Sequence, residues 1–348
     1  MNTRGIVVCL VVCFLIGLGC KGSSSRKESS RTSAAVGTYI LLASEHLVPP
    51  SEEVVTAFGG AVMDGFGHGI LTYRNSKNQN FVDSDSFKID THYQVDADRS
   101  DPGAITPDGE FMFRVRKSAN PSIWFFHREA SGAVTSLING NYHYIGYRHV
   151  NKGPGLLTGV GTATFTGTGG FSLNATLSNN TPELRAGLVT VTSLGVVAAI
   201  EGTETYTGFT DREGDVVGWL DMDLVSGSYI RIDLFVRAGT GMHQATLNGT
   251  YNLGRFFQAS LAEEPGSGFG TISFDAKGSW TMDYYDNNNT RRQDGGTYVM
   301  ASNGAAVLTS PTGVLQAFLS PNMDRRILFI ADTDVSNGEV GFFVATDR

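Results

Sequence analysis

The chain has 348 residues, of which 41% are hydrophobic and 17% charged, a balance typical of a globular protein long enough for more than one domain. Residues 1–35 carry five basic side chains and one acidic, a charge of +4, so the formal charge of −8 leaves −12 for residues 36–348. Phosphate backbones repel an acidic body of this kind, which argues against nucleic acid as a partner.

The chain begins with a segment that predicts export. Met1–Arg4 is a short basic start, and Gly5–Gly19 is an apolar stretch. A membrane-spanning helix needs about 20 apolar residues, whereas the core of a signal peptide needs about 7–15, followed by small residues at the cleavage site. Gly17 and Gly19 are such small residues, so residues 1–19 are predicted to be a signal peptide.

A lipid-attachment motif ends this segment. The sequence Ile16-Gly17-Leu18-Gly19-Cys20 resembles the lipobox of bacterial lipoproteins, in which a small residue precedes the cysteine that receives the lipid and becomes the new N-terminus. It departs from the family pattern at Gly17, where the family favours leucine. Cys9, Cys13 and Cys20 are the only cysteines, so the mature body has no disulfide. The resemblance implies lipidation of Cys20, with plain secretion and an uncleaved anchor as alternatives.

Residues 20–35 are predicted to be a flexible tether between the lipid and the folded body. The stretch KGSSSRKESSRTS over residues 21–33 is rich in serine and charge and has no apolar periodicity, so it has no face to bury in a core. In proteobacterial lipoproteins, aspartate directly after the cysteine favours the inner membrane, and this chain has Lys21 there. The resemblance therefore implies an outer-membrane location, on either its periplasmic or its surface face.

The body contains an internal repeat of about 100 residues, visible as phrases that recur three times in the same order. The first phrase is Val36-Gly37-Thr38-Tyr39, then Asn139-Gly140-Asn141-Tyr142, then Asn248-Gly249-Thr250-Tyr251. The second ends in a turn at Asp64–Gly67, at Thr166–Gly169 and at Asp275–Gly278. These phrases predict three repeats, over residues 36–133, 134–240 and 241–348.

Two further phrases extend the comparison. Thr91–Val95 matches Gly296–Val299 well and Gly187–Val191 poorly, which indicates that the second repeat has diverged there. An apolar run lies near the end of each repeat, at Ile123–Phe126, Ile230–Val236 and Ile327–Ile330. The middle run alternates apolar and polar residues, which predicts an antiparallel strand with one buried and one solvated face.

The fold class predicted for the body is all-β. Runs rich in Val, Ile, Thr, Tyr and Phe are separated by Gly, Asn and Asp turns, which gives about seven or eight strands per repeat. Such a sheet must hide its edges by closing into a barrel or by folding into a sandwich. Leu247–Gly254 resembles the opening strand of calycin barrels, in which a glycine and, one residue later, an aromatic residue close the end of the barrel. This resemblance favours three tandem antiparallel β-barrel-like repeats over β-sandwiches.

The mature body lacks the motifs of common catalytic and metal sites. Its histidines show no zinc-ligand spacing, and it has no Gly-x-Ser-x-Gly elbow. The acidic runs Asp96–Asp101 and Asp283–Asn289 do not follow the EF-hand pattern and are interpreted as solvated hairpin tips. We therefore expect no catalytic residue, no cofactor and no metal ion.

Aromatic residues are the candidates for a ligand site, because they stack on sugars and line the mouths of barrels. The predicted rim residues are Trp124, Tyr142, Trp219 and Trp280. The predicted function is that of a lipid-anchored, non-enzymatic envelope protein that binds a small apolar ligand, a glycan or another envelope protein, or builds surface structure. Any pocket is expected to be apolar, with few convergent titratable groups. The alternatives are an exported hydrolase, such as a glycosidase with paired carboxylates, and a transmembrane outer-membrane barrel.

Overall fold

The computed structural model describes residues 33–47, 53–96, 100–118, 120–150, 156–221, 229–258, 265–333 and 340–348. In this part of the chain the helices are three short 3₁₀ turns, η1 (Ser33–Ala35), η2 (Thr135–Leu137) and η3 (Gln244–Leu247). None of the described helices is long and apolar enough to cross a membrane. The predicted signal peptide and Cys20 lie outside the described residues, as does the tether up to residue 32.

The remaining elements are strands, which form three sheets of eight. Repeat 1 contains β1 (Gly37–Leu47), β2 (Glu53–Met63), β3 (His68–Asn75), β4 (Asn80–Ser86), β5 (Gln94–Val95), β6 (Gly103–Ile105), β7 (Phe111–Arg116) and β8 (Ser122–Arg128). Repeat 2 contains β9 (Asn139–Val150), β10 (Leu156–Thr166), β11 (Gly170–Leu177), β12 (Pro182–Val191), β13 (Val196–Glu201), β14 (Glu204–Thr210), β15 (Val216–Asp221) and β16 (Tyr229–Arg237). Repeat 3 contains β17 (Gly249–Gln258), β18 (Pro265–Phe274), β19 (Ser279–Asp286), β20 (Arg291–Met300), β21 (Ala305–Ser310), β22 (Gly313–Leu319), β23 (Ile327–Asp332) and β24 (Val340–Asp347).

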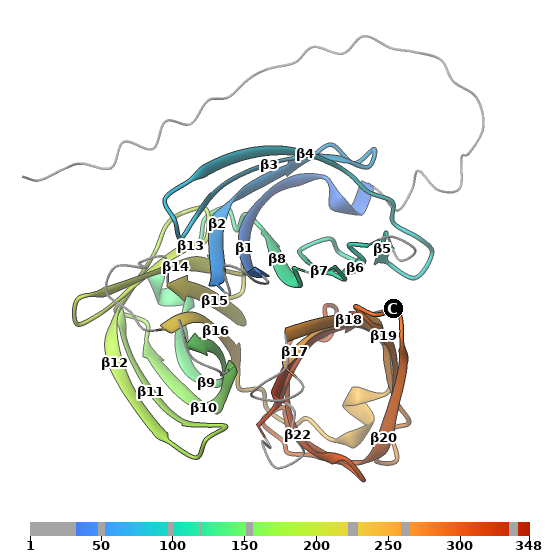
Figure 1. The fold of residues 1–348 in the computed structure, drawn as a ribbon. Helices are drawn as coiled ribbons and strands as arrows, with labels where there is room; N and C mark the ends of the chain where they lie inside the picture. The colour runs from blue at the N-terminus through green and yellow to red at the C-terminus, as the bar shows by residue number, and fades with distance from the viewer. Residues whose placement is uncertain are drawn as a thin grey trace, which may run out of the picture.

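The all-β prediction is confirmed, and so is the arrangement of tandem barrel-like repeats. All strand pairings in the described residues are antiparallel, and each repeat pairs its first strand with its eighth. The sheets of repeats 2 and 3 close because their fourth and fifth strands also pair, β12 with β13 and β20 with β21. Repeat 1 instead forms an open sheet whose edges are β4 and β5. Figure 1 shows this blue sheet curving over the two closed barrels.

The repeat phrases align only in part with the structure. The turn phrases occupy equivalent positions in the three repeats. In each repeat, the carbonyl of the last glycine of the turn accepts a hydrogen bond from a backbone amide on the fourth strand or just after it. The donors are the amides of Phe87, Val189 and Tyr298, and the acceptors are the carbonyls of Gly67, Gly169 and Gly278 respectively. The match of Thr91–Val95 with Gly296–Val299 is therefore wrong. The counterpart of Thr297-Tyr298 is Ser86-Phe87, so repeat 1, not repeat 2, has diverged. The apolar run Ile327–Ile330 lies on β23, whereas the runs matched to it lie on the eighth strands of their repeats.

This divergence explains why repeat 1 stays open. The fifth and sixth strands of a repeat form the hairpin that completes its barrel. In repeats 2 and 3 these strands have six and seven residues, whereas in repeat 1 the corresponding β5 and β6 have only two and three. In repeat 2, β13 pairs with β12 along four residues, whereas in repeat 1 the corresponding contact is a single bridge between Ile89 and Val95. The edge of β4 is therefore left unpaired within the sheet.

The three repeats share one core. Twenty-five buried residues, drawn almost evenly from the three sheets, form a single apolar cluster in which the outward faces of their first, seventh and eighth strands meet. Phe329 of repeat 3, for example, contacts Phe111 of repeat 1 edge to face with ring centroids 6.1 Å apart. A ring of equivalent hydrogen bonds joins the second strand of each repeat to the seventh strand of the next: Thr56 to the Asp221 carbonyl, Thr158 to the Asp332 carbonyl and Ser267 to the Arg116 carbonyl. The repeats thus pack around a pseudo-three-fold axis.

The shared core corrects the expectation for Ile230–Val236. Its apolar positions were expected to form a buried face and its polar positions a solvated face. Instead, Ile232 and Leu234 belong to the core shared between repeats, and Asp233 points into barrel 2 with no exposed surface. There Asp233 accepts bonds from Trp219 Nε1 (2.9 Å) and from Arg185 Nη1 (2.7 Å). Both faces of the strand are buried, because one faces its own barrel and the other faces the neighbouring repeats.

Side chains fill one end of each repeat in the same way. Tyr39, Tyr142 and Tyr251, the residues of the first phrase, are buried there beneath the guanidinium groups of Arg128, Arg237 and Arg326, at 5.6, 5.2 and 5.2 Å from the ring centroids. Each arginine pairs with a carboxylate, from Glu110, Asp215 and Asp347 respectively. Each repeat also has its own interior apolar cluster, separate from the shared core.

Candidate functional site

The structure does not bring the four predicted rim residues together. Tyr142 and Trp219 lie inside barrel 2, and Trp280 lies inside barrel 3, all with at most 1% of their surface exposed. Trp280 Nε1 donates to the Thr297 carbonyl at 3.1 Å. Trp124, on β8, is half-buried and lines a cleft in repeat 1. It is the one member of this predicted set that lies at a described cavity.

The cleft lies where the sheet of repeat 1 fails to close. It has a volume of about 480 Å³ and is lined from β1, β3, β4, β7 and β8 and by Asp101. Phe81, Asp83 and Asp85 share one face of β4, on which Phe81 and Asp85 are half-buried and Asp83 is exposed. On the facing side, Arg114 and Arg116 of β7 point into the cleft, because Phe113 and Val115, which alternate with them, point into the shared core.

Arg114 connects the two edges of the open sheet. Its guanidinium pairs with Asp85 of β4 and, at 3.2 Å, with Asp96, which follows β5. Its Nε also donates to the Asp101 carbonyl at 3.1 Å. These contacts hold β4 beside β7 with side-chain bonds in place of the backbone ladder that closes the other barrels.

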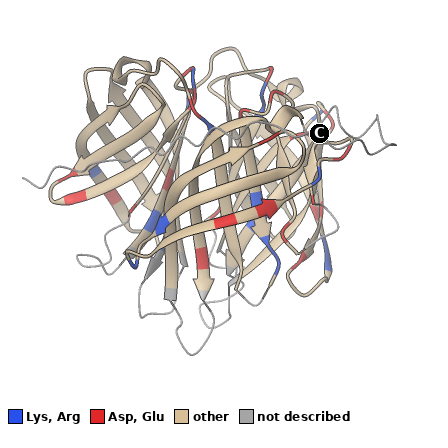
Figure 2. Ribbon diagram, turned by 90° about the horizontal axis from the view of Figure 1, so that it is seen from above, with Lys and Arg blue, Asp and Glu red and all other residues tan. Residues whose placement is uncertain are grey.

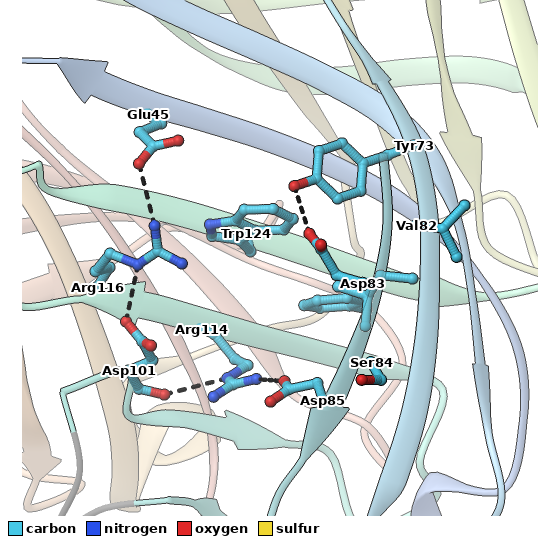
Figure 3. Close-up of a pocket in the computed structure, with 12 residues that line it drawn as sticks. Glu45, Tyr73, Val82, Asp83, Ser84, Asp85, Asp101, Arg114, Arg116 and Trp124 are labelled. Atoms are coloured by element: carbon cyan, nitrogen blue, oxygen red, sulfur yellow. Dashed lines mark hydrogen bonds and ion pairs between the residues drawn. The ribbon is translucent and has the colours of Figure 1, made fainter. Parts of the chain in front are cut away.

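Arg116 forms the second ion-pair node of the cleft. It contacts Glu45 of β1 and Asp101, each at 3.1 Å (Figure 3). The neighbouring carboxylates raise the pKa of Arg116 against the opposing effect of burial, so the group remains a cation.

An aromatic wall faces the ion pairs. Tyr73 of β3 stacks on Phe81 with ring centroids 5.1 Å apart and meets Trp124 edge to face at 5.4 Å. The Tyr73 hydroxyl donates to Asp83 at 2.8 Å, and Trp124 Nε1 donates to Ser122 at 2.9 Å. Burial, together with Asp83, raises the pKa of Tyr73, so its hydroxyl remains a neutral donor. In Figure 3, Tyr73, Asp83 and Trp124 converge on the same space.

The polarity of this cleft corrects two expectations. A pocket was expected to be apolar with few titratable groups, but this one is lined by four carboxylates and two guanidinium groups. The run Asp96–Asp101 was expected to be a solvated hairpin tip, but Asp96 is 2% exposed and Asp101 is paired with Arg116. The reason in both cases is the open wall, where arginine side chains replace backbone pairing. Asp286 of the second acidic run does cap a hairpin turn, since its carboxylate accepts the amides of Asn288 and Thr290, but it is not solvated, because it is 3% exposed and pairs with Arg292 at 3.1 Å.

The charged residues of the cleft follow a pattern in the sequence that differs from the known catalytic and metal-binding motifs. Asp83 and Asp85 alternate on β4, and Arg114 and Arg116 alternate on β7. Because side chains two apart on a strand share a face, each pair places two like charges on one side of the sheet. Two such faces of opposite charge within one repeat indicate that the two strands are joined by ion pairs between their side chains.

A second cavity, of about 390 Å³, lies at the corresponding end of barrel 3. Its centre is the buried Arg255, whose guanidinium lies 4.3 to 4.8 Å from the ring centroids of Phe257, Tyr284 and Phe343. In barrel 2 this region is occupied by a network around Arg185, which pairs with Asp233 and with Glu201 at 2.6 Å. Across the described parts of all three repeats, no three His, Cys, Asp or Glu side chains are placed to share a metal ion.

Charged residues are scattered over all three repeats, between long stretches of uncharged strand (Figure 2).

No protein-family model matches the chain, and no curated protein matches its sequence. Among solved structures it is similar to transferrin binding protein B, a vaccine antigen of Haemophilus parasuis, with 8% identity and a TM-score of 0.30 over 89% of this chain and 75% of that chain. It is also similar to a protein of unknown function from the DUF3598 family of Nostoc punctiforme, with 10% identity and a TM-score of 0.22 over 93% and 99% of the two chains.

Proposed function

We propose that the chain is an exported, lipid-anchored envelope protein that binds a ligand or partner, without chemical conversion, in the cleft of repeat 1. The observation that carries the proposal is the open wall: two repeats close their barrels, and the third has a polar, aromatic-lined cleft of about 480 Å³ in the place of that closure. A cavity of this size that combines aromatic surface with a few fixed polar groups is typical of a ligand site.

The binding proposal has a steric test. Leu71 of β3 lines the cleft, and its neighbour Thr72 is exposed on the outer face of the same strand. Leu71→Trp is expected to fill the cleft and abolish ligand-induced stabilisation, whereas Thr72→Trp adds the same ring outside and should leave it intact. The measurement is the shift in melting temperature produced by panels of basic peptides, glycans and fatty acids.

The same melting-temperature measurements show whether the cleft binds any of these compounds. A class of compound that raises the melting temperature of the wild type and of Thr72→Trp, but not of Leu71→Trp, supports the proposal. If no class does so, or if both variants respond equally, the cleft is not a binding site.

The lipid anchor is argued from Cys20 and its surrounding lipobox-like sequence. We expect the wild-type chain, expressed in a bacterial host, to partition into detergent and to shift in mobility when the lipoprotein signal peptidase is inhibited with globomycin. Cys20→Ser should remove both effects, and Cys13→Ser, a change within the apolar core, should keep both. Detergent partitioning of Cys20→Ser would contradict lipidation at this residue.

The enzyme alternative would use the same cleft, because its four carboxylates are the groups a glycosidase requires. Glycoside hydrolysis needs one carboxyl group that holds a proton and one that is ionised. Here Glu45, Asp85 and Asp101 each contact an arginine, so three of the four carboxylates already serve as ion-pair partners within the protein. If the wild type released reducing sugar from the glycans of the panel and Asp83→Asn did not, the protein would be a glycosidase and the binding proposal would be wrong.

A further inference from the structure

We propose that the cleft of repeat 1 recognises a cationic group, an ammonium or guanidinium, carried by a free amine or by a basic side chain of a partner protein. This inference rests on the proposed binding function and names the chemistry of its ligand. It is carried by the charge inside the cleft and by the position of Asp83 beside two aromatic rings.

The charges that line the cleft do not balance. Glu45, Asp83, Asp85 and Asp101 face Arg114 and Arg116, which leaves the lining with a net charge of −2. Three of the carboxylates are engaged by these arginines. Asp83 is different, because it is exposed to solvent at the cleft and accepts a hydrogen bond from the neutral hydroxyl of Tyr73, and no ion pair joins it to a cation among the described residues. A cation entering the cleft would supply the missing charge.

The aromatic wall suits the same ligand. The ring faces of tyrosine and tryptophan attract cations, and guanidinium and ammonium groups are bound in proteins by such rings beside a carboxylate. Tyr73 and Trp124 meet edge to face at 5.4 Å, so their ring planes are nearly perpendicular, at 87°. The Tyr73 hydroxyl fixes Asp83 at this corner. Asp83 and the two rings therefore lie together at one corner of the cleft, where the carboxylate and the aromatic surface can contact the same ligand group.

The rest of the molecule favours cations as well. Residues 36–348 carry a formal charge of −12, which attracts basic ligands over a distance and repels acidic ones. A neutral sugar would also stack on the rings, but it would leave the net charge of the cleft uncompensated in a partly desolvated site. A fatty acid would bring its carboxylate to an already negative cleft. Charge therefore selects the cation among the ligand classes that the aromatic wall accepts.

The test is isothermal titration of the mature chain with spermidine, with an acetylated lysine amide and an acetylated arginine amide, and with maltotriose as the neutral probe. We expect the cations to bind and Asp83→Asn to weaken their binding by about threefold to fivefold, as the loss of one charge contact at an exposed carboxylate implies. Asp83→Glu should retain binding. Asp324→Asn removes the same charge from an exposed position in repeat 3 and should have no effect. Higher salt should weaken binding to the wild type more than to Asp83→Asn.

The arms of the experiment separate the possible outcomes. Spermidine bound much more tightly than the amino-acid amides points to a free amine, and the reverse points to a basic side chain. Equal affinity of the wild type and Asp83→Asn for every cation overturns the inference. Maltotriose bound in place of the cations, and lost in Leu71→Trp, also overturns it while leaving the proposed binding function intact. If no probe binds the wild type and no class in the thermal panel does, both proposals fail.

Discussion

Phe329→Ala is expected to destabilise all three repeats together, by about 3–5 kcal/mol, although the residue belongs only to repeat 3. Phe329 is fully buried in the shared core, where its ring packs edge to face against Phe111 of repeat 1 and stacks on Phe342 at 6.1 Å. Its removal leaves a cavity where the repeats meet. Because each repeat buries its outer face against the other two, we expect one cooperative unfolding transition for the whole body.

The chain supplies its own reporters for this experiment. Its three tryptophans are Trp124, Trp219 and Trp280, one in each repeat. In each variant that keeps one tryptophan and replaces the other two by phenylalanine, the urea midpoint from the remaining tryptophan should equal the midpoint from circular dichroism of that same variant. Phe329→Ala should then lower the midpoint by a similar amount in all three variants. Val299→Ala, at a 68% exposed position on the outside of repeat 3, is the control and should change stability by under about 0.5 kcal/mol. A midpoint that falls only at Trp280 would show that the repeats unfold independently.

Strand content and the number of repeats were predictable because both depend on local pattern. On β11, Phe171, Leu173 and Ala175 alternate with exposed residues, and this period of two is typical of a strand buried on one face. The turn phrases were equally informative, because Asp64 and Asp275 each accept two backbone amides within their own turn, a contact that depends on a few neighbouring residues.

The shared core could not be predicted in the same way. An apolar face indicates burial without indicating which partner buries it, so the pattern predicts that Ile232 and Leu234 are buried but does not predict that they face the neighbouring repeats. The charged Asp233 was assigned to solvent because its partner Arg185 lies 48 residues earlier in the chain. Tertiary contacts of this range leave no periodic signal.

The cleft could not be predicted from strand patterns, because it forms where repeat 1 lacks the full-length fifth and sixth strands of the other repeats. Thr91–Val95 resembles the fourth-strand phrase of repeat 3 in composition, and this chance likeness concealed the shortening of β5 to two residues. With the correct register, Ser86-Phe87 takes that place, and the unpaired edge of β4 could have been anticipated from chain length alone. The arginine and aspartate alternations on β7 and β4 then mark the side chains that bridge the edge.

His127 of β8 is a buried histidine at the interface between repeats 1 and 2. Its ring is fully buried and stacks on Phe209 of repeat 2, with centroids 5.1 Å apart. Nδ1 lies 2.9 Å from the Arg128 carbonyl oxygen, so the Nδ1–H donates to it, and among the described residues Nε2 has no hydrogen-bond partner. Burial, with a smaller contribution from the nearby cation Arg325, lowers the pKa of His127 to about 3. The ring is therefore held neutral in the folded protein.

This histidine is expected to make the body sensitive to acid. The ordinary pKa of 6.5 applies in the unfolded chain, so as pH falls below 6.5 the unfolded state binds a proton that the folded state refuses until about pH 3. The stability that neutral His127 contributes is complete above pH 6.5 and declines below it, by about 3 kcal/mol at pH 4. His127→Phe keeps an aromatic ring against Phe209 and removes the titration. The free energy of unfolding of this variant, measured in urea, should therefore rise relative to the wild type by about 3 kcal/mol between pH 7 and pH 4.

The control for His127 is Val236→Ala, which changes the counterpart position in repeat 2 within the same shared core. It removes packing but no titratable group, so its cost should be the same at every pH. The contrast between the two variants separates proton linkage from loss of packing at one interface. A pH-independent difference between His127→Phe and the wild type would mean that the imidazole takes up its proton without unfolding, through local opening of the contact between repeats 1 and 2.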